Sequence, residues 1–178
     1  MNNTAKNLAK TGVITACLCV LAPISVPIGA IPVSLATFVI YLAACIFDVK
    51  TSTFAVAAYI LLGVCGLPVF SGYRGGAGVI FGATGGYIIG YIPLAVIVSL
   101  FKEIKNGGCL QSFSGIVVGT AVLYALGTVW YCFVSGTEFI PALSACVIPF
   151  LPFDAVKAVI AVLISRPVSK AIMKTENK

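Results

Sequence analysis

Long apolar runs alternate with short polar or glycine-rich segments along the whole chain. A helix that crosses a membrane needs about 20 mostly apolar residues, and six of the runs come near this length. The pattern therefore predicts an all-α integral membrane protein in which residues 1–178 form a single domain, a bundle of six transmembrane helices. We expect the six spans at about residues 10–25, 33–47, 52–65, 84–101, 113–134 and 149–164.

The composition narrows the class of protein. The chain is 60% hydrophobic and 9% charged, whereas about a quarter of the residues of a soluble domain are charged. It contains no histidine, which is the commonest general base and the commonest metal ligand. Its seven cysteines lie mostly inside apolar runs and lack the paired spacing of a metal site. We therefore expect neither a metal site nor a cofactor, and no sequence feature requires an enzyme.

Basic residues gather on one side of the expected bundle. With six spans the two termini share a side, and the loops of the other side contain only Arg74 as a cation, with Glu138 as the acid. Because lysine and arginine are enriched in cytoplasmic loops, we expect both termini to be cytoplasmic. The net charge of +6 does not indicate nucleic-acid binding, since no basic patch is interleaved with aromatic residues. The side of the termini collects Lys6, Lys10, Lys50, Lys102, Lys105, Arg166, Lys170, Lys174 and Lys178.

A glycine-rich segment, residues 66–87, separates the third and fourth spans and reads GLPVFSGYRGGAGVIFGATGGY. Its eight glycines favour an outward-facing loop over a membrane helix. Arg74 is its one charge, and such a cation is costly near the membrane unless an anion meets it. The segment is either a lid over a pocket or a solvent-side connector. It is not a nucleotide-binding loop, because Ala83 and Thr84 follow Gly82 where a P-loop has lysine.

The sixth span opens with two opposite charges. Asp154 and Lys157 are three residues apart, so they share a face of a helix. One interpretation is an ion pair that only caps the helix. The other is a polar recognition site inside a pocket, because an ionisable residue in a span indicates function. Together with Arg74, the pair gives a net positive site suited to a small monoanion, with Asp154 accepting from ligand N–H groups.

Small residues recur at four-residue spacing in the first span, Ala5 with Ala9 and Gly12 with Ala16. Such spacing lets another helix approach closely. The approaching helix belongs either to a partner subunit or to this protein's own bundle, and the sequence leaves both open.

Three segments resemble a known family. The glycine-rich segment, PFLPFDAVKA at residues 149–158 and ISVPIGAIPVSLATF at residues 24–38 are similar to signatures of the BioY family. Its members are the biotin-specific substrate-binding (S) components of energy-coupling factor (ECF) transporters. The resemblance covers nearly the whole chain, and the first of the three motifs is long enough to be specific by itself.

The resemblance implies a six-helix bundle in the cytoplasmic membrane of a prokaryote, with a pocket near the outer surface and biotin as the transported ligand. It implies no enzymatic activity and no cofactor. The expected partners are a membrane coupling subunit, which Ala5, Ala9, Gly12 and Ala16 would contact, and ATPase subunits. The ligand-binding residues that match the family are Arg74, Asp154, Lys157, Tyr59, Thr84, Gly85, Gly86 and Tyr87.

The chain departs from the family pattern at four positions. Ala36 stands where the family usually has glutamine, and Ser34 replaces a threonine, which puts polar contacts from the second span in doubt. Ala83 replaces a proline and Phe153 a glycine. Two alternatives stay open: an S component for another vitamin or a biotin precursor, and a membrane-embedded enzyme or assembly factor.

Overall fold

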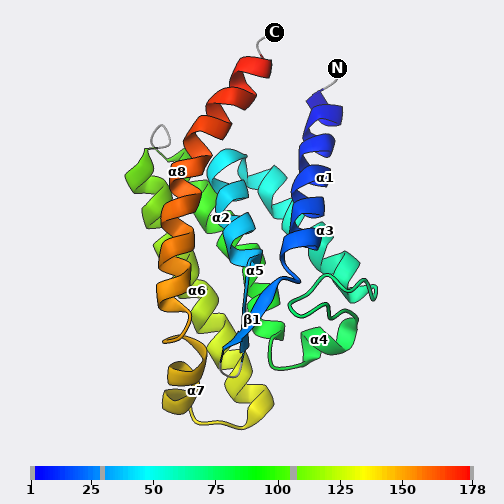
Figure 1. Ribbon diagram of the computed structural model, residues 1–178, viewed down its shortest axis with the longest axis vertical. Helices are drawn as coiled ribbons and strands as arrows, with labels where there is room; N and C mark the ends of the chain where they lie inside the picture. The colour runs from blue at the N-terminus through cyan, green and yellow to red at the C-terminus, as the bar shows by residue number, and fades with distance from the viewer. Residues whose placement is uncertain (1–2, 29–30, 105–107, 177–178) are drawn as a thin grey trace.

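Eight helices and two short strands follow one another in the computed structural model, which describes residues 3–28, 31–104 and 108–176 (Figure 1). Helices account for most of these residues, as the sequence predicts. In chain order the elements are α1 (Asn3–Leu21), β1 (Ser25–Ile28), β2 (Ile31–Ser34), α2 (Ala36–Ile46), α3 (Val49–Val64), α4 (Ala77–Phe81), α5 (Gly85–Glu103), α6 (Cys109–Ser135), α7 (Phe139–Cys146) and α8 (Leu151–Glu176).

Each expected span coincides with a helix, but several limits differ. α1 begins at Asn3 and ends at Leu21, whereas the expected span was 10–25. α8 continues to Glu176, well past residue 164. Hydropathy marks the part of a helix that suits a bilayer, and lysines and small polar residues extend a helix beyond that part without breaking it. Helix limits and span limits are therefore different quantities in this chain.

By length and hydropathy two helices suit a membrane span, and there are up to three if a bent pair counts as one span. α5 and α6 each suit a span, and α7 followed by α8, bent by 48° at the break between them, suits a third. α2 and α3 are apolar but shorter, with 11 and 16 residues.

The expectation of an all-α protein is wrong in one place. Between the expected spans 10–25 and 33–47 the structure has an antiparallel hairpin, with Ser25 opposite Ser34 and Pro27 opposite Pro32. Proline cannot donate to a ladder and is confined to edge strands. In a sheet of two strands both are edges, so two prolines fit. The connection between the expected spans 113–134 and 149–164 also contains a helix, α7.

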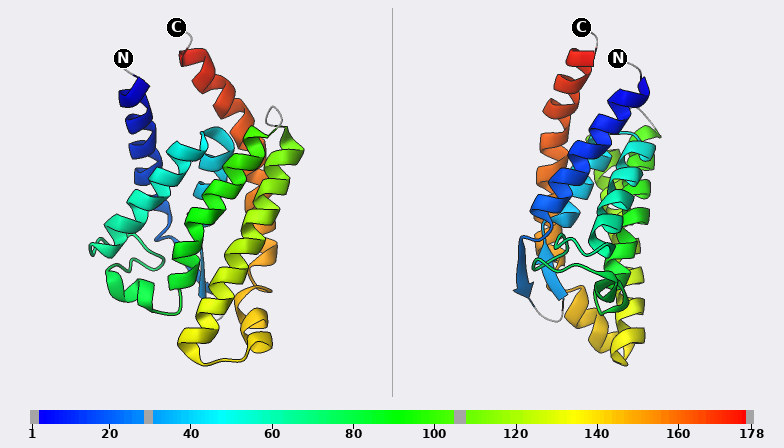
Figure 2. Two further views of the ribbon diagram at one scale, coloured as in Figure 1. Left: turned by 180° about the vertical axis from the view of Figure 1, so that it is seen from behind. Right: turned by 90° about the vertical axis from the view of Figure 1, so that its right-hand side faces the viewer.

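The two termini lie at one end of the bundle, and the hairpin, α4 and α7 lie at the other (Figures 1 and 2). α5 and α6 pack most closely of all the helices. Glycines make this possible: a Cβ at Gly90 would meet Leu123 at 2.7 Å, and one at Gly119 would meet Leu94 at 2.8 Å. Small residues let neighbouring membrane helices approach in this way.

The glycine-rich segment forms a loop with one short helix, α4, inside it. Two backbone hydrogen bonds tie the loop to the bundle: Gly72 N donates to Pro23 O at 3.0 Å, and Gly76 N donates to Gly63 O at 2.7 Å. Gly76 has φ 95° and Gly72 has φ 72°, which residues with a side chain rarely adopt. The loop therefore depends on glycine at these two anchor points.

Candidate functional site

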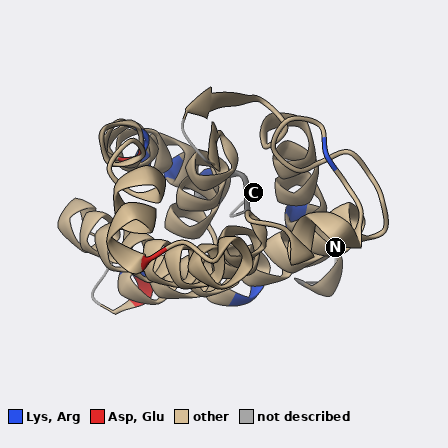
Figure 3. Ribbon diagram, turned by 90° about the horizontal axis from the view of Figure 1, so that it is seen from below, with Lys and Arg blue, Asp and Glu red and all other residues tan. Residues whose placement is uncertain are grey.

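A narrow cavity of about 40 Å³ lies at the end of the bundle away from the termini. The hairpin, the glycine-rich segment, α5, α6 and the first turn of α8 enclose it. Seen from this end, most of the ribbon carries no charged residue (Figure 3). The lining residues are Ile31, Pro32, Ser34, Thr37, Phe70, Ser71, Arg74, Val79, Thr84, Tyr87, Ile88, Tyr91, Leu123, Tyr124, Phe150, Asp154 and Lys157.

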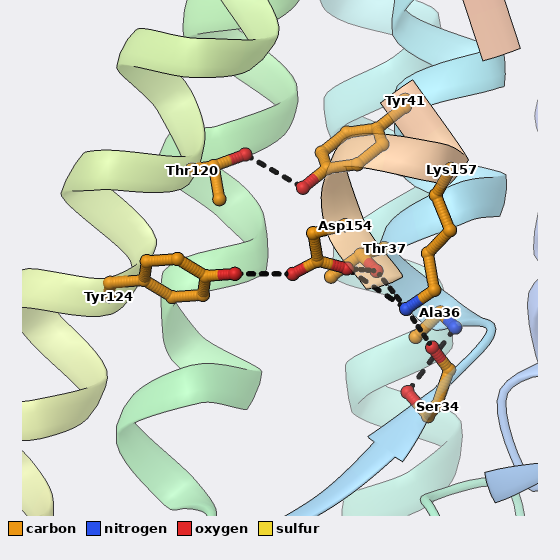
Figure 4. A network of polar contacts seen from close by, with 8 residues as sticks. All are labelled: Ser34, Ala36, Thr37, Tyr41, Thr120, Tyr124, Asp154 and Lys157. Atoms are coloured by element: carbon orange, nitrogen blue, oxygen red, sulfur yellow. Dashed lines mark hydrogen bonds and ion pairs between the residues drawn. The ribbon is translucent and has the colours of Figure 1, made fainter. Parts of the chain in front are cut away.

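The Asp154 carboxylate is buried in the cavity wall, with 5% of the residue exposed. Its Oδ1 accepts from Lys157 Nζ at 2.9 Å and from Thr37 Oγ1 at 3.0 Å. Its Oδ2 accepts from the Tyr124 hydroxyl at 2.7 Å (Figure 4). A carboxylate offers about four acceptor positions, and three of them are occupied. One position is therefore left for a donor on a ligand.

All three ammonium protons of Lys157 have acceptors. Besides Asp154, its Nζ donates to Ser34 O at 2.7 Å and to Thr37 Oγ1 at 3.1 Å (Figure 4). The network thus joins α8 to the end of β2, to α2 and, through Tyr124, to α6. It is more than a cap on α8, because every further partner comes from another element.

Arg74 stands in contrast to this closed network. It lines the same cavity from the glycine-rich segment, but it is exposed. Its Nε donates to Ser71 O at 3.2 Å, and its backbone pairs with Phe70. Among the described residues it has no acidic partner, so its guanidinium is available to an anion that enters the cavity. The structure therefore brings Arg74, Asp154 and Lys157 to one site.

The end of the glycine-rich segment divides into two roles. Thr84 and Tyr87 line the cavity, and the Tyr87 hydroxyl donates to Cys146 O at 3.2 Å. Gly85 and Gly86 do not line it. A Cβ at Gly86 would collide with Trp130 and would lie 2.9 Å from Leu126 O, so this glycine serves the contact between α5 and α6. A Cβ at Gly85 would collide with the carbonyl of Ile80.

Tyr59 lies behind the wall of the cavity and is not part of its lining. It is 1% exposed, and its hydroxyl donates to Val69 O at 3.1 Å. Its ring meets Phe70 edge to face with centroids 5.7 Å apart. Because Phe70 does line the cavity, the structure gives Tyr59 a supporting position.

Sequence reasoning missed Thr37 and Tyr124 and doubted the contribution of the second span. The residues at positions 34 and 37 in fact supply a carbonyl and a hydroxyl to the network. Tyr124 is a single hydroxyl in a long apolar helix, and nothing in its spacing sets it apart from tyrosines that only fill space.

The small-residue face of α1 (Ala5, Ala9, Gly12, Ala16) is exposed along its whole length. Nothing lies within 4 Å of a Cβ built at Gly12. α1 packs on the bundle through another face, where Thr15 Oγ1 donates to Ala55 O at 3.1 Å. The small residues therefore do not serve packing within the described bundle.

Residues 1–174 match the BioY family. The chain belongs to the BioY family. This confirms the resemblance that the three sequence motifs carry. The biotin transporter BioY of Thermotoga maritima is 40% identical over 165 residues, which cover 93% of this chain and 96% of that protein. The probable biotin transporter BioY of Pyrococcus horikoshii is 34% identical over 161 residues, 90% of this chain and 94% of its own.

A solved structure has the same fold as this BioY-family chain. It is described as the S-component for biotin from an ECF-type ABC transporter, and it is 28% identical with a TM-score of 0.88. The match covers 96% of this chain and 95% of that one. The likeness therefore extends over nearly the whole chain.

Proposed function

We propose that this protein captures biotin at the outer surface of the cytoplasmic membrane, as the S component of an ECF-type uptake system. It is a transporter subunit and not an enzyme. Its BioY relatives carry the name biotin transporter. One observation supports the site most strongly: a buried carboxylate with one free acceptor position, Asp154, shares a cavity with an unpaired cation, Arg74.

The two ends of biotin fit the two ends of this site. The ureido ring offers N–H donors, and Asp154 has the acceptor position to receive one. The ligand carboxylate needs a cation, and Lys157 has already committed its protons to Asp154, Ser34 and Thr37. The carboxylate is therefore assigned to Arg74, where a guanidinium can bind it with two parallel hydrogen bonds.

The cavity must widen to admit this ligand. Its volume of about 40 Å³ holds a few water molecules, whereas small-molecule sites typically have 300–1,000 Å³. α5, α6 and α8 are packed helices, so the walls that can shift are the hairpin and the part of the glycine-rich segment between its anchors at Gly72 and Gly76. Binding accordingly involves an outward shift of the segment that carries Arg74.

The transport role rests on topology and partners. We place six spans across the cytoplasmic membrane of a prokaryote, with both termini inside, because the basic residues gather at the end of the termini. The sequence has no nucleotide-binding loop, so separate ATPase subunits supply the energy. The exposed small-residue face of α1 is assigned to the membrane coupling subunit, because closely packed helices need such a face.

Calorimetric titration of the purified protein with biotin tests the site. Asp154→Asn should weaken binding by about 2 kcal/mol or more, since it removes one partner of a buried charge pair. Arg74→Ala should weaken it as well, and because Arg74 is exposed this variant should fold normally. Glu138→Gln is the matched control, an exposed acid at the same end outside the cavity. Wild-type affinity in both Asp154→Asn and Arg74→Ala would end the proposal.

A thermal-shift series with biotin, dethiobiotin and other vitamins tests the ligand assignment. A ligand that binds only the native state raises its stability according to its affinity and concentration. Biotin should give the largest shift. A larger shift in melting temperature with another vitamin would show that this vitamin, and not biotin, is the ligand of the site.

Co-purification with the coupling module tests the partner face. Gly12→Leu with Ala16→Leu should abolish the complex, because two leucines keep a facing helix at a distance. Ala125→Leu places the same side chain on an exposed position of α6 and should have no effect. If the double variant still forms the complex, the coupling subunit binds elsewhere.

A further inference from the structure

A second cavity, of about 520 Å³, lies at the opposite end of the bundle, near the termini. The last turns of α2 and α5, the first turn of α6 and the middle of α8 enclose it. Three cations and one acid line it: Lys102, Arg166, Lys170 and Glu103. No residue that lines the first cavity lines this one.

Lys102 and Glu103 already bind backbone groups of the bundle. Lys102 Nζ donates to Ile46 O at 2.9 Å and to Phe47 O at 3.1 Å, where it satisfies carbonyl groups at the end of α2. Glu103 accepts from Val49 N at 3.2 Å at the start of α3. The acid therefore sits at a helix N-terminus, which stabilises negative charge, and it is not committed to the cations of α8.

Arg166 and Lys170 have no such partners. They stand one turn apart on the same face of α8, both exposed, and within the described part of the chain neither makes an ion pair or a side-chain hydrogen bond. Like charges at this spacing destabilise a helix. The buried hydroxyls of Ser112 and Ser165 complete the wall. The cavity is thus hydroxyl-lined, and among its lining residues the cations outnumber the acid by three to one.

An apolar furrow continues from this cavity toward the middle of the bundle. Cys109 and Val162 border both the cavity and a hollow of about 340 Å³ lined by Phe113, Val159 and Leu163. Phe113 in turn borders a further hollow of about 260 Å³ between α6 and α8, which is apolar near Phe113 and Val117 and reaches Tyr124 and Asp154 at its far end. These two helices run alongside each other but pack less closely than α5 and α6, which leaves the furrow open.

We propose that an anionic phospholipid binds here, with its phosphate between Arg166 and Lys170 and an acyl chain in the furrow between α6 and α8. A free anion would account for the cations but not for the apolar continuation. From Cys109 to Val117 the furrow follows two turns of α6, about 12 Å at 1.5 Å per residue, which suits part of an acyl chain. Basic pockets between membrane helices on the cytoplasmic side are typical sites for anionic head groups.

Thermal stability and binding in detergent test this proposal. Phosphatidylglycerol should raise the melting temperature of the protein more than phosphatidylcholine does. Arg166→Gln with Lys170→Gln should weaken phosphatidylglycerol binding roughly 30-fold, about fivefold for each cation. Lys50→Gln with Lys174→Gln removes the same charge from exposed positions at the same end that do not line the cavity, and it should leave binding near the wild-type value.

A third variant separates the lipid from a free anion. Val159→Trp fills the furrow without changing any charge, so it should reduce binding of phosphatidylglycerol. Equal stabilisation by inorganic phosphate, unaffected by Val159→Trp, would overturn the lipid assignment. If Arg166→Gln with Lys170→Gln and Lys50→Gln with Lys174→Gln weaken phosphatidylglycerol binding equally, the site itself is overturned. Binding would then depend only on the net charge of the protein. Circular dichroism and gel filtration confirm that each variant is folded before binding is measured.

Discussion

The two cavities at opposite ends of the bundle treat charge in opposite ways. At the first, Asp154 is buried and Lys157 is half-buried, and five hydrogen bonds join the two to each other and to their neighbours. At the second, Arg166 and Lys170 are exposed and lack ion-pair partners among the described residues. Asp154 and Lys157 bind each other and hold neighbouring elements together, whereas these two cations of the second cavity are available to bind an anion. Removing a charge should therefore lower the stability of the protein at the first cavity and raise it slightly at the second.

The largest effect is expected at Lys157. Lys157→Met keeps a long unbranched side chain but leaves the Asp154 carboxylate buried without its cation. Removing one partner of a buried pair costs about 3–5 kcal/mol, which unfolding in detergent should show as a loss of stability. Lys170→Met, the same substitution on the same helix, should cost little. If the two variants are equally stable, the contrast between the cavities is wrong.

The double variant Asp154→Asn with Lys157→Met sharpens that result. Replacing both members of a buried ion pair is often nearly neutral, because no uncompensated charge remains. Stability should therefore recover in part while biotin binding stays lost. A double variant that is less stable than Lys157→Met would show that the two residues do not act as a pair.

A smaller loss is expected at Tyr124, which holds the other oxygen of the same carboxylate. Tyr124→Phe removes one hydrogen bond to a charged group, worth about 1.5–3 kcal/mol, and it should weaken biotin binding as Asp154 becomes free to turn. Tyr131→Phe is the control, two turns further along α6 and outside the cavity. A loss of stability as large in Tyr131→Phe would mean that the hydroxyl of Tyr124 has no special role.

The sequence predicts the charged residues of this site, because burying a charged group in an apolar chain costs free energy. Asp154, Lys157 and Arg74 stand out because an ionised group in such a setting needs a partner or a ligand, and the structure places all three at one cavity. Thr37 and Tyr124 do not stand out, because a hydroxyl is tolerated in many helices.

The rest of the fold shows a similar limit. The apolar runs predict where helices form, but the hairpin was missed because residues 25–34 are apolar in either conformation. The glycine pattern predicts a loop at residues 66–83, yet it does not tell a glycine that lines a pocket from one that lets helices touch. Gly86 was expected in the site and in fact faces Trp130.

Asp48 offers a test at the end of the bundle that contains the second cavity, because it caps α3 there. Its oxygens accept from Thr51 N at 3.1 Å and from Thr51 Oγ1 at 2.7 Å at the start of α3. Partial burial works to raise its pKa, but these hydrogen bonds outweigh it and lower the pKa below the usual value. Its contribution is therefore present above the unfolded pKa of about 3.9 and is lost as the pH falls through the lower folded value.

Asp48→Asn should accordingly cost about 1 kcal/mol or less at pH 7, within the range for helix caps. The difference from the wild type should shrink below about pH 4, where both forms are uncharged. Melting temperatures between pH 3 and pH 7 measure it, with Glu138→Gln, an exposed acid at the other end, as the control. A gap that stays constant over this range would rule out the charged cap as the cause.

The smallest effect, and the one of opposite sign, is expected at Arg166. In neutral detergent Arg166→Gln relieves the repulsion from Lys170, so the melting temperature should rise slightly, by the equivalent of a few tenths of a kcal/mol. In micelles that contain phosphatidylglycerol the same variant should melt below the wild type, because it loses the lipid phosphate that the two cations share. Lys50→Gln, at an exposed position that does not line the cavity, should keep the same sign in both detergents. If Arg166→Gln is destabilised without lipid, Arg166 already has a structural partner. The charges of the second cavity would then hold elements together as those of the first cavity do.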